Sequence, residues 1–158
     1  MSQHLFLEGM IQIGKSTLLQ ELLEPYREKV GGFVCQRLAD SEGSTVAFRI
    51  GPAASTTLTK PYDESCDHIF RRIRENQQSE NHLEIFETIG VQLLKHNEGK
   101  SLILLDEIGG IELINDTFRE ALYDILLGDT PCLGVIKSLE KAKYMSSPGN
   151  LSIYEHNL

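Results

Sequence analysis

Apolar residues are spaced along this chain in two ways, in short continuous runs and in longer segments with a helical repeat. The short runs predict strands at residues 5–7, 33–38, 44–50, 101–106, 132–137 and 151–155. The helical repeat predicts helices at about residues 15–28, 81–97 and 116–127. Strands that alternate with helices in this way predict an α/β fold, in which helices flank a mainly parallel central sheet.

One part of the chain departs from this alternation. Residues 39–43 are turn formers, and they join two predicted strands by a connection that is too short for a parallel crossover. We therefore expect an antiparallel β-hairpin beside the parallel strands. Residues 51–65 are polar and contain Pro52 and Pro61, which predicts a loop with little regular structure. Residues 67–74 are compatible with either a short helix or an ordered surface segment.

The first predicted strand leads into a segment with the phosphate-loop pattern G-x-x-x-x-G-K-[ST]. The leucines of the first predicted helix follow at once, so the pattern lies between a strand and a helix. This is the context in which the pattern indicates a phosphate-binding loop. The residues predicted to bind nucleotide phosphates are Gly9, Met10, Ile11, Gln12, Ile13, Gly14, Lys15, Ser16 and Thr17.

The residue types in this segment suit phosphate chemistry. Gly9 and Gly14 permit backbone angles at which successive N–H groups point toward phosphate oxygens, and the helix N-terminus adds partial positive charge. Lys15 supplies a full charge to the β- and γ-phosphates, and the Ser16 hydroxyl is a ligand for Mg²⁺. The sequence therefore predicts a site for Mg²⁺ together with ATP, GTP or another nucleoside triphosphate.

A second acidic segment complements the phosphate loop. The apolar run at 101–106 ends in Asp106, and Glu107 follows directly. An acid at the carboxyl end of such a strand is the usual ligand that holds Mg²⁺ with its water shell. The neighbouring Glu107 is placed to orient and deprotonate a water near the γ-phosphate. We therefore predict Asp106 and Ser16 as metal ligands, and Glu107 and Lys15 as catalytic residues.

Composition and charge limit the classes of partner that we expect for such a site. The 158 residues are enough for one domain, and we expect 1–158 to form a single phosphate-loop nucleotide-binding domain. A net charge of −8 argues against nucleic acid or an anionic membrane as a partner held by bulk electrostatics. The sequence has no apolar run of membrane-spanning length, no signal-peptide pattern and no paired spacing among its three cysteines, so we expect a cytoplasmic protein. It identifies no protein partner.

Residues 106–113 read Asp-Glu-Ile-Gly-Gly-Ile-Glu-Leu. They resemble the D-E-I-G-x-x-E-L signature of the thermophile-type nucleoside-triphosphatases, called cancer-related nucleoside triphosphatase in animals. The resemblance covers about residues 4–138, and it includes Gly31-Gly32-Phe33 and the aromatic position of Phe118. It implies a three-layer P-loop NTPase fold and Mg²⁺-dependent hydrolysis of nucleoside triphosphates with broad base specificity.

The resemblance also implies a strand order and one further site residue. Strand 132–137 would lie between the acidic strand and the phosphate-loop strand, and it would end in a polar sensor of the γ-phosphate, Lys137 or Ser138. The phosphate loop departs from the family pattern, because Ile11 and Gln12 stand where that family usually has a proline and an extra glycine.

Two other functions remain open from sequence. The phosphate loop is similar to that of deoxynucleoside kinases, although the chain has no clear Arg-rich lid or acceptor-binding motif. A nucleotide-binding switch or accessory protein with little turnover is the third possibility. The basic cluster at 70–74 is either a solvated face or the source of an arginine finger, and Arg37 and Arg49 in the predicted hairpin could approach the nucleotide.

Overall fold

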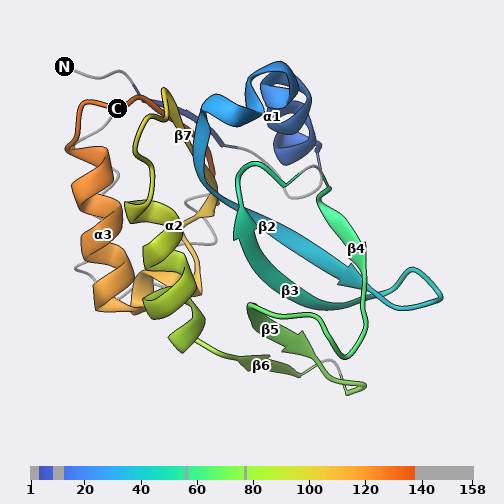
Figure 1. Ribbon diagram of the computed structural model, residues 1–158. Helices are drawn as coiled ribbons and strands as arrows, with labels where there is room; N and C mark the ends of the chain where they lie inside the picture. Colours follow the sequence, from blue (N-terminus) through green and yellow to red (C-terminus); the bar gives the residue numbers. More distant parts are fainter. Residues whose placement is uncertain (1–3, 9–12, 56, 77, 138–158) are drawn as a thin grey trace.

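The computed structural model describes residues 4–8, 13–55, 57–76 and 78–137. The elements in chain order are β1 (Leu5–Leu7), α1 (Lys15–Leu23), the 3₁₀ segment η1 (Glu24–Lys29), β2 (Val30–Ala39), β3 (Thr45–Pro52), β4 (Thr59–Pro61), β5 (Ile69–Ile73), β6 (Ser79–Asn81), the π-helical segment η2 (Phe86–Gly90), α2 (Val91–Lys95), β7 (Leu102–Ile108), the 3₁₀ segment η3 (Ile111–Ile114), α3 (Asp116–Leu126) and β8 (Cys132–Ile136). Figure 1 shows their arrangement.

These strands form one sheet with two differently built parts. The strand order is β1-β8-β7-β2-β3-β5-β6, with β4 also paired to β2. The pairs β1–β8, β8–β7 and β7–β2 are parallel, whereas β2–β3, β3–β5 and β5–β6 are antiparallel. The predicted α/β fold is therefore confirmed, and β8 does lie between the acidic strand β7 and the phosphate-loop strand β1. The added hairpin is also confirmed.

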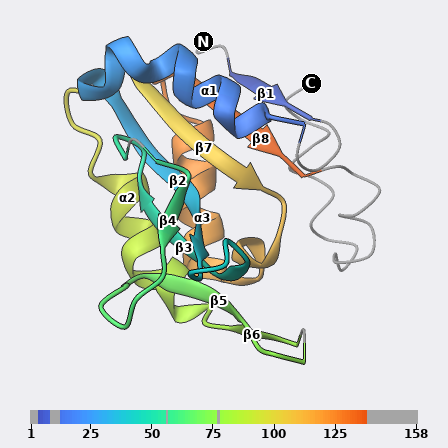
Figure 2. The same ribbon diagram turned by 90° about the vertical axis from the view of Figure 1, so that its right-hand side faces the viewer.

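Helices cover both faces of the parallel part and give three layers. In Figure 2, α1 lies in front of β7, whereas α2 and α3 lie behind it. The helix nearest the phosphate loop, α1, gives way to η1 at Glu24, one residue before Pro25, so it is shorter than the predicted first helix. Of its apolar residues, Leu19 and Leu23 are buried, whereas Leu18, Leu22 and Tyr26 are more than 40% exposed. No helix among the described residues is long and apolar enough to cross a membrane.

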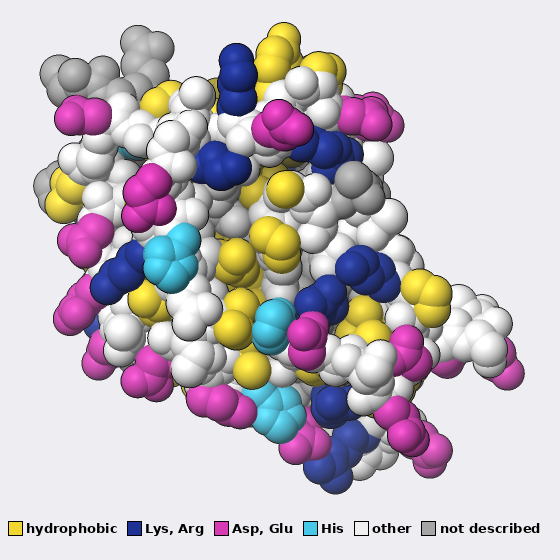
Figure 3. Space-filling view, in the orientation of Figure 1, with side chains coloured by type: hydrophobic (Ala, Val, Ile, Leu, Met, Phe, Trp, Pro, Cys, Tyr) yellow, Lys and Arg dark blue, Asp and Glu magenta, His cyan; other side chains and the backbone are white. Residues whose placement is uncertain are grey.

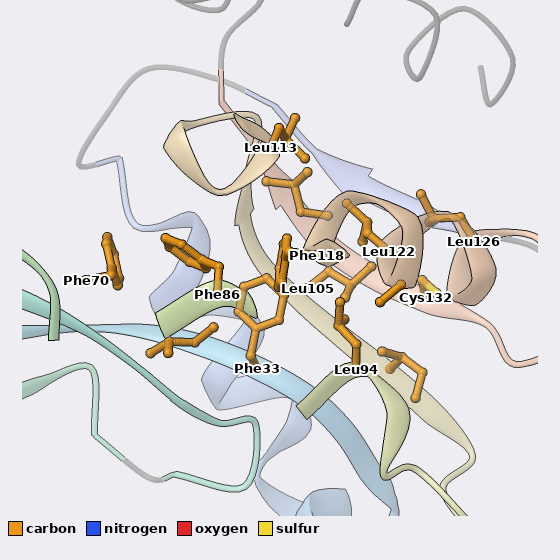
Figure 4. Packing of buried hydrophobic residues seen from close by; sticks show 14 of the residues in the cluster. Phe33, Phe70, Phe86, Leu94, Leu105, Leu113, Phe118, Leu122, Leu126 and Cys132 are labelled. Carbon is orange, nitrogen blue, oxygen red and sulfur yellow. The ribbon is translucent and has the colours of Figure 1, made fainter. Parts of the chain in front are cut away.

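The larger core fills the space between the sheet and helices α2 and α3. Phe118 of α3 is fully buried, and its ring lies 5.8 Å from that of Phe33 and 5.4 Å from that of Phe86. Figure 4 shows these rings meeting Leu105 of β7 at the centre of the cluster. The smaller core lies under α1 and includes Leu19 and buried residues of β2, β7 and β8. Both faces of β7 are thus covered, as its continuous apolar sequence predicts.

The second half of β2 pairs with other strands than the first half does. Val30–Phe33 pairs with β7, and beyond this point β2 pairs with β3 and β4. We call β3, β4, β5, β6, the segments that connect them and the part of β2 beyond Phe33 the wing. β2 begins three residues before the predicted strand, because Gly32, at φ +88°, lets the backbone of β7 approach closely. A Cβ at this position would lie 2.1 Å from the Leu104 carbonyl oxygen.

The wing is also where the sequence predictions were least accurate. Residues 69–73 form strand β5, so the helical alternative for 67–74 is wrong. The predicted loop 51–65 contains the end of β3 and the short strand β4. The strands β4 and β5 are defined by their pairing with β2 and β3, which local periodicity does not reveal. The predicted strand 151–155 lies outside the described residues.

Candidate nucleotide-binding and catalytic site

The predicted site residues come from two segments that meet at one edge of the sheet. The arrowheads of β1, β7 and β8 point the same way in Figure 2, and α1 begins at this edge. Open α/β sheets bind ligands outside the carboxyl ends of their strands. The arrangement therefore brings the start of α1 next to the acidic end of β7.

The described end of the phosphate loop has the geometry that a phosphate site needs. Gly14 has φ +90°, a conformation that glycine adopts without strain, and it is the N-cap of α1. No side chain caps the helix, so its first N–H groups point out of the helix end. Lys15 is the first helical residue and is half-buried. The predicted phosphate ligands Gly9 to Gln12 lie outside the described residues.

Asp106 joins the two segments. Its side chain is 2% exposed. One carboxylate oxygen, Oδ1, accepts a hydrogen bond from the Ser16 hydroxyl at 2.7 Å. The other, Oδ2, accepts from the Cys35 backbone N–H at 3.1 Å. The structure thus brings together Ser16 and Asp106, the two predicted metal ligands, across 90 residues of sequence.

Burial changes the acidity of groups around this carboxylate. Desolvation by burial raises the pKa of Asp106 from 3.8 to about 6, and the nearby Glu107 charge adds to the shift. Hydrogen bonds from Ser16 and Cys35 and the charge of Lys137 act in the opposite direction. Burial also raises the pKa of the Cys35 thiol well above its usual value, so this cysteine is a poor nucleophile.

Glu107 has an unusual backbone. Its φ of +61° is left-handed, although it is not a glycine. The pairing of β7 with β8 is regular up to Leu105–Gly134 and resumes at Ile108–Ile136, so β7 has one extra residue here and forms a bulge. The predicted strand end at Asp106 is therefore wrong, because β7 continues to Ile108. Bulges re-aim side chains, and strained backbone of this kind collects at functional sites.

Two polar residues near the bulge complete the described site. Lys137, a predicted γ-phosphate sensor, follows β8 and donates its backbone N–H to the Ile108 carbonyl at 2.8 Å. Its charge lowers the pKa of Asp106, in opposition to the larger effect of burial. Glu112 is 4% exposed and accepts hydrogen bonds from two backbone amides of the turn after β7. The signature contains Glu112, but sequence reasoning assigned it no role. Ser138, the other predicted sensor, lies outside the described residues.

The arginines of the basic cluster at 70–74 are engaged within the wing. Arg71 donates to Asn81, Arg72 to Tyr62, and Arg74 pairs with Glu80. Two strands, β2 and β3, separate β5 from the acidic strand β7. These contacts favour the solvated-face interpretation of the basic cluster over an arginine finger.

Arg49, which the sequence left as a possible nucleotide contact, is also bound inside the wing. It donates to the side chain of the buried Gln36 at 3.2 Å and pairs with Asp67 at 2.6 Å. Arg37 is half-buried on β2, two residues beyond Cys35.

Comparison with known proteins gives this site a family context. A family model described as NTPase matches residues 4–154. A nucleoside-triphosphatase THEP1 of Methanocaldococcus jannaschii is 26% identical over 140 residues, which cover 84% of this chain and 76% of that relative. The cancer-related nucleoside-triphosphatase homolog of Mus musculus is 29% identical over 160 residues, which cover 90% of this chain and 78% of that relative.

Solved structures share the fold. The crystal structure of THEP1 from the hyperthermophile Aquifex aeolicus matches with a TM-score of 0.63 and 18% identity, over 96% of this chain and 94% of that one. The solution structure of a human cancer-related nucleoside triphosphatase matches with a TM-score of 0.64 and 21% identity, over 87% of this chain and 77% of that one.

Proposed function

Because the chain belongs to the NTPase family, it hydrolyses nucleoside triphosphates, and we propose that it does so with Mg²⁺ at Ser16 and Asp106 and with Glu107 as the base. Hydrolysis in this family favours the hydrolase interpretation over a kinase or a silent switch. The observation that carries the proposal is the 2.7 Å contact between the Ser16 hydroxyl and Asp106 Oδ1. It pairs the phosphate loop with the acidic strand in the manner of P-loop nucleotide sites.

The residues at this contact fit Mg²⁺. The cation prefers oxygen ligands and takes one or two from the protein, while phosphates and waters supply the rest. A hydroxyl and a carboxylate meet here, and burial raises the pKa of that carboxylate to about 6, so a cation beside it would relieve an unfavourable buried charge. Mg²⁺ bound there would neutralise charge on the β- and γ-phosphates.

The remaining chemistry is assigned to this chain's own residues. The first amides of α1 and Lys15 bind the phosphates of the substrate through charge and hydrogen bonds. Glu107 accepts a proton from water as the water oxygen attacks the γ-phosphorus. The bond between that phosphorus and the bridging oxygen breaks, and the nucleoside diphosphate leaves. Predicted loop ligands Gly9 to Gln12, together with Ile13 and Thr17, belong to the same proposal.

The surface is consistent with a nucleotide as the principal partner. Figure 3 shows acidic side chains interspersed with basic ones on the face it displays, over the wing as elsewhere. The chain carries a net charge of −8, so we expect no nucleic acid partner. Its three cysteines are free thiols, which suits a reduced, cytoplasmic setting. We propose that residues 1–158 act as one nucleotide-binding domain.

The test replaces Glu107 by Gln, which keeps the size of the side chain but removes the base. We expect steady-state phosphate release to fall by about 100-fold or more. Affinity for Mg²⁺ with a non-hydrolysable triphosphate should stay unchanged, because the phosphate ligands are intact. Glu120→Gln, on the exposed side of α3, is the matched control and should retain full activity. Undiminished phosphate release by Glu107→Gln, with binding intact, would exclude Glu107 as the base.

A further inference from the structure

Glu112 is a buried acid whose carboxylate accepts hydrogen bonds from the backbone of a turn. It lies in η3, just after the bulge of β7, and it is 4% exposed. Its Oε1 atom accepts hydrogen bonds from the backbone N–H groups of Gly109 and Gly110, each at 2.7 Å. Burying a carboxylate is costly unless it receives strong hydrogen bonds. The chain therefore commits a buried acid to holding two amides of one turn.

That turn lies directly after the strained residue Glu107. A left-handed conformation at a non-glycine residue persists only when the surrounding structure fixes the backbone on both sides. On the N-terminal side, Asp106 is held by Ser16 and by the Cys35 amide. On the C-terminal side, Ile108 accepts a hydrogen bond from the Lys137 amide at 2.8 Å.

The hydrogen bonds to Glu112 extend the C-terminal anchor by two further residues. Gly109 also has a positive φ, of +106°, so the chain turns twice within three residues after Asp106. Without the carboxylate, the amides of Gly109 and Gly110 would lose their acceptor, and the turn could relax together with the bulge. Lys137 lies against the same turn, since its Nζ and Glu112 Oε2 are both within 3 Å of where a Cβ on Gly110 would stand. The Lys137 ammonium and the second carboxylate oxygen of Glu112 thus both lie beside Gly110.

We propose that Glu112 is a positioning residue for hydrolysis: its two hydrogen bonds hold the bulge that sets the direction of the Glu107 carboxylate. This inference rests on the proposed role of Glu107 as the base. Glu112 touches neither water nor phosphate in this scheme. It acts through the backbone of Gly109 and Gly110, and the aim of Glu107 depends on that backbone.

Two variants of Glu112 separate the effect of hydrogen-bond geometry from the effect of charge. Glu112→Gln keeps an oxygen at the position of Oε1 without the charge, whereas Glu112→Asp keeps the charge but is one methylene too short to reach both amides. We expect Glu112→Asp to lower kcat by about 10-fold or more, because small misplacements of a catalytic group carry penalties of this order. Glu112→Gln should retain kcat within about threefold, since its oxygen still accepts both bonds. Both variants should bind Mg²⁺ with a non-hydrolysable triphosphate as the wild type does.

Other outcomes of this comparison overturn the inference. If Glu112→Asp retains full kcat, or if Glu112→Gln loses as much kcat as Glu112→Asp, hydrogen-bond geometry at Glu112 does not position the base. Failure of the proposed function is recognised separately, because it appears as full activity of Glu107→Gln. A large effect of Glu107→Gln together with no effect of Glu112→Asp would leave the base in place and discard only the role of Glu112.

A stability cycle tests the same link without a measurement of activity. Glu107→Gly relieves the left-handed strain, so it should raise the midpoint of thermal unfolding by about 2–4 °C. If Glu112 holds the strained bulge, the same substitution should raise the midpoint less in the Glu112→Asp background, where the bulge has already relaxed. Equal shifts in the two backgrounds would mean that Glu112 and the backbone strain at Glu107 are independent.

Discussion

The two parts of the sheet are built from different interactions. In the parallel part, β1, β8, β7 and the start of β2 are covered on both faces by helices, and their side chains pack into two apolar cores. In the wing, antiparallel strands carry arginines that pair with neighbours on the same or adjacent segments. Its own buried cluster consists of Leu38, Ala47 and Ile69.

The predicted functional groups lie on one side of this division. Ser16, Asp106 and Glu107 all belong to the parallel part, where buried apolar strands fix the backbone. A rigid frame of this kind can hold a buried carboxylate and a strained bulge, both of which cost stability. The wing carries the basic cluster at 70–74, but its arginines are engaged locally. Charge alone is therefore a poor guide to the site in this molecule, and the position of a residue in the sheet is a better one.

The largest expected difference between the two parts concerns aromatic packing. Phe118 in the parallel part is fully buried between two other phenylalanine rings, whereas Phe48 in the wing is half-buried and stacks on Phe70. Phe118→Ala should lower the free energy of unfolding by about 3–5 kcal/mol, because it leaves a closed cavity. Phe48→Ala should cost about 1–2 kcal/mol, in proportion to the smaller area it buries. Chemical denaturation of both variants measures the difference, and equal losses would contradict the comparison.

Burial of Asp106 in the candidate site should lower the free energy of unfolding in a pH-dependent way. Burial raises the pKa of Asp106 to about 6 in the folded protein, from 3.8. The folded state therefore binds this proton more tightly than the unfolded state does. The resulting stabilisation is complete below about pH 3.8 and is lost as the pH rises through about 6. Above that pH the ionised carboxylate costs on the order of 2–3 kcal/mol relative to a neutral group.

Asp106→Asn tests this sign directly. In metal-free protein at pH 8, the variant should be more stable than the wild type by on the order of 2–3 kcal/mol, and the difference should shrink toward pH 4. Urea unfolding in the presence of a chelator at the two pH values gives the measurement. Asp124→Asn, on the exposed side of α3, is the control and should show no such pH-dependent gain. If Asp106→Asn has the same effect at both pH values, burial does not destabilise this carboxylate.

The smallest expected effect separates two arginines of the wing. The Arg49 side chain is 13% exposed and donates to the buried Gln36, whereas the Arg74 side chain is 64% exposed. Arg49→Ala should cost about 1–2 kcal/mol, because it leaves the Gln36 oxygen without this donor in a buried site. Arg74→Ala should leave the unfolding midpoint unchanged, since an exposed ion pair is screened by water. A larger loss for Arg74→Ala than for Arg49→Ala would show that surface charge pairs stabilise the wing.

The same two parts differ in how accurately their strands and helices could be predicted from sequence. The parallel strands β7 and β8 and the helix α3 were placed within two residues, because a continuous apolar run or a strong helical repeat is a local signal. The strand β5 was not recognised, since its sequence Ile-Phe-Arg-Arg-Ile lacks strict alternation and its structure comes from pairing with β3 and β6.

Local sequence patterns alone predict the chemistry of the candidate site. The spacing of Gly14, Lys15 and Ser16 and the acids at the end of an apolar strand are local patterns, and local patterns are legible without the fold. Only the tertiary structure decided that Ser16 and Asp106 meet, that β7 continues past Asp106 through a bulge, and that Glu112 holds the turn behind it. The first two features depend on contacts between segments far apart in the chain and on the register of β7 against β8, whereas the third depends on the shape of the turn after β7. No periodicity within a single segment encodes them.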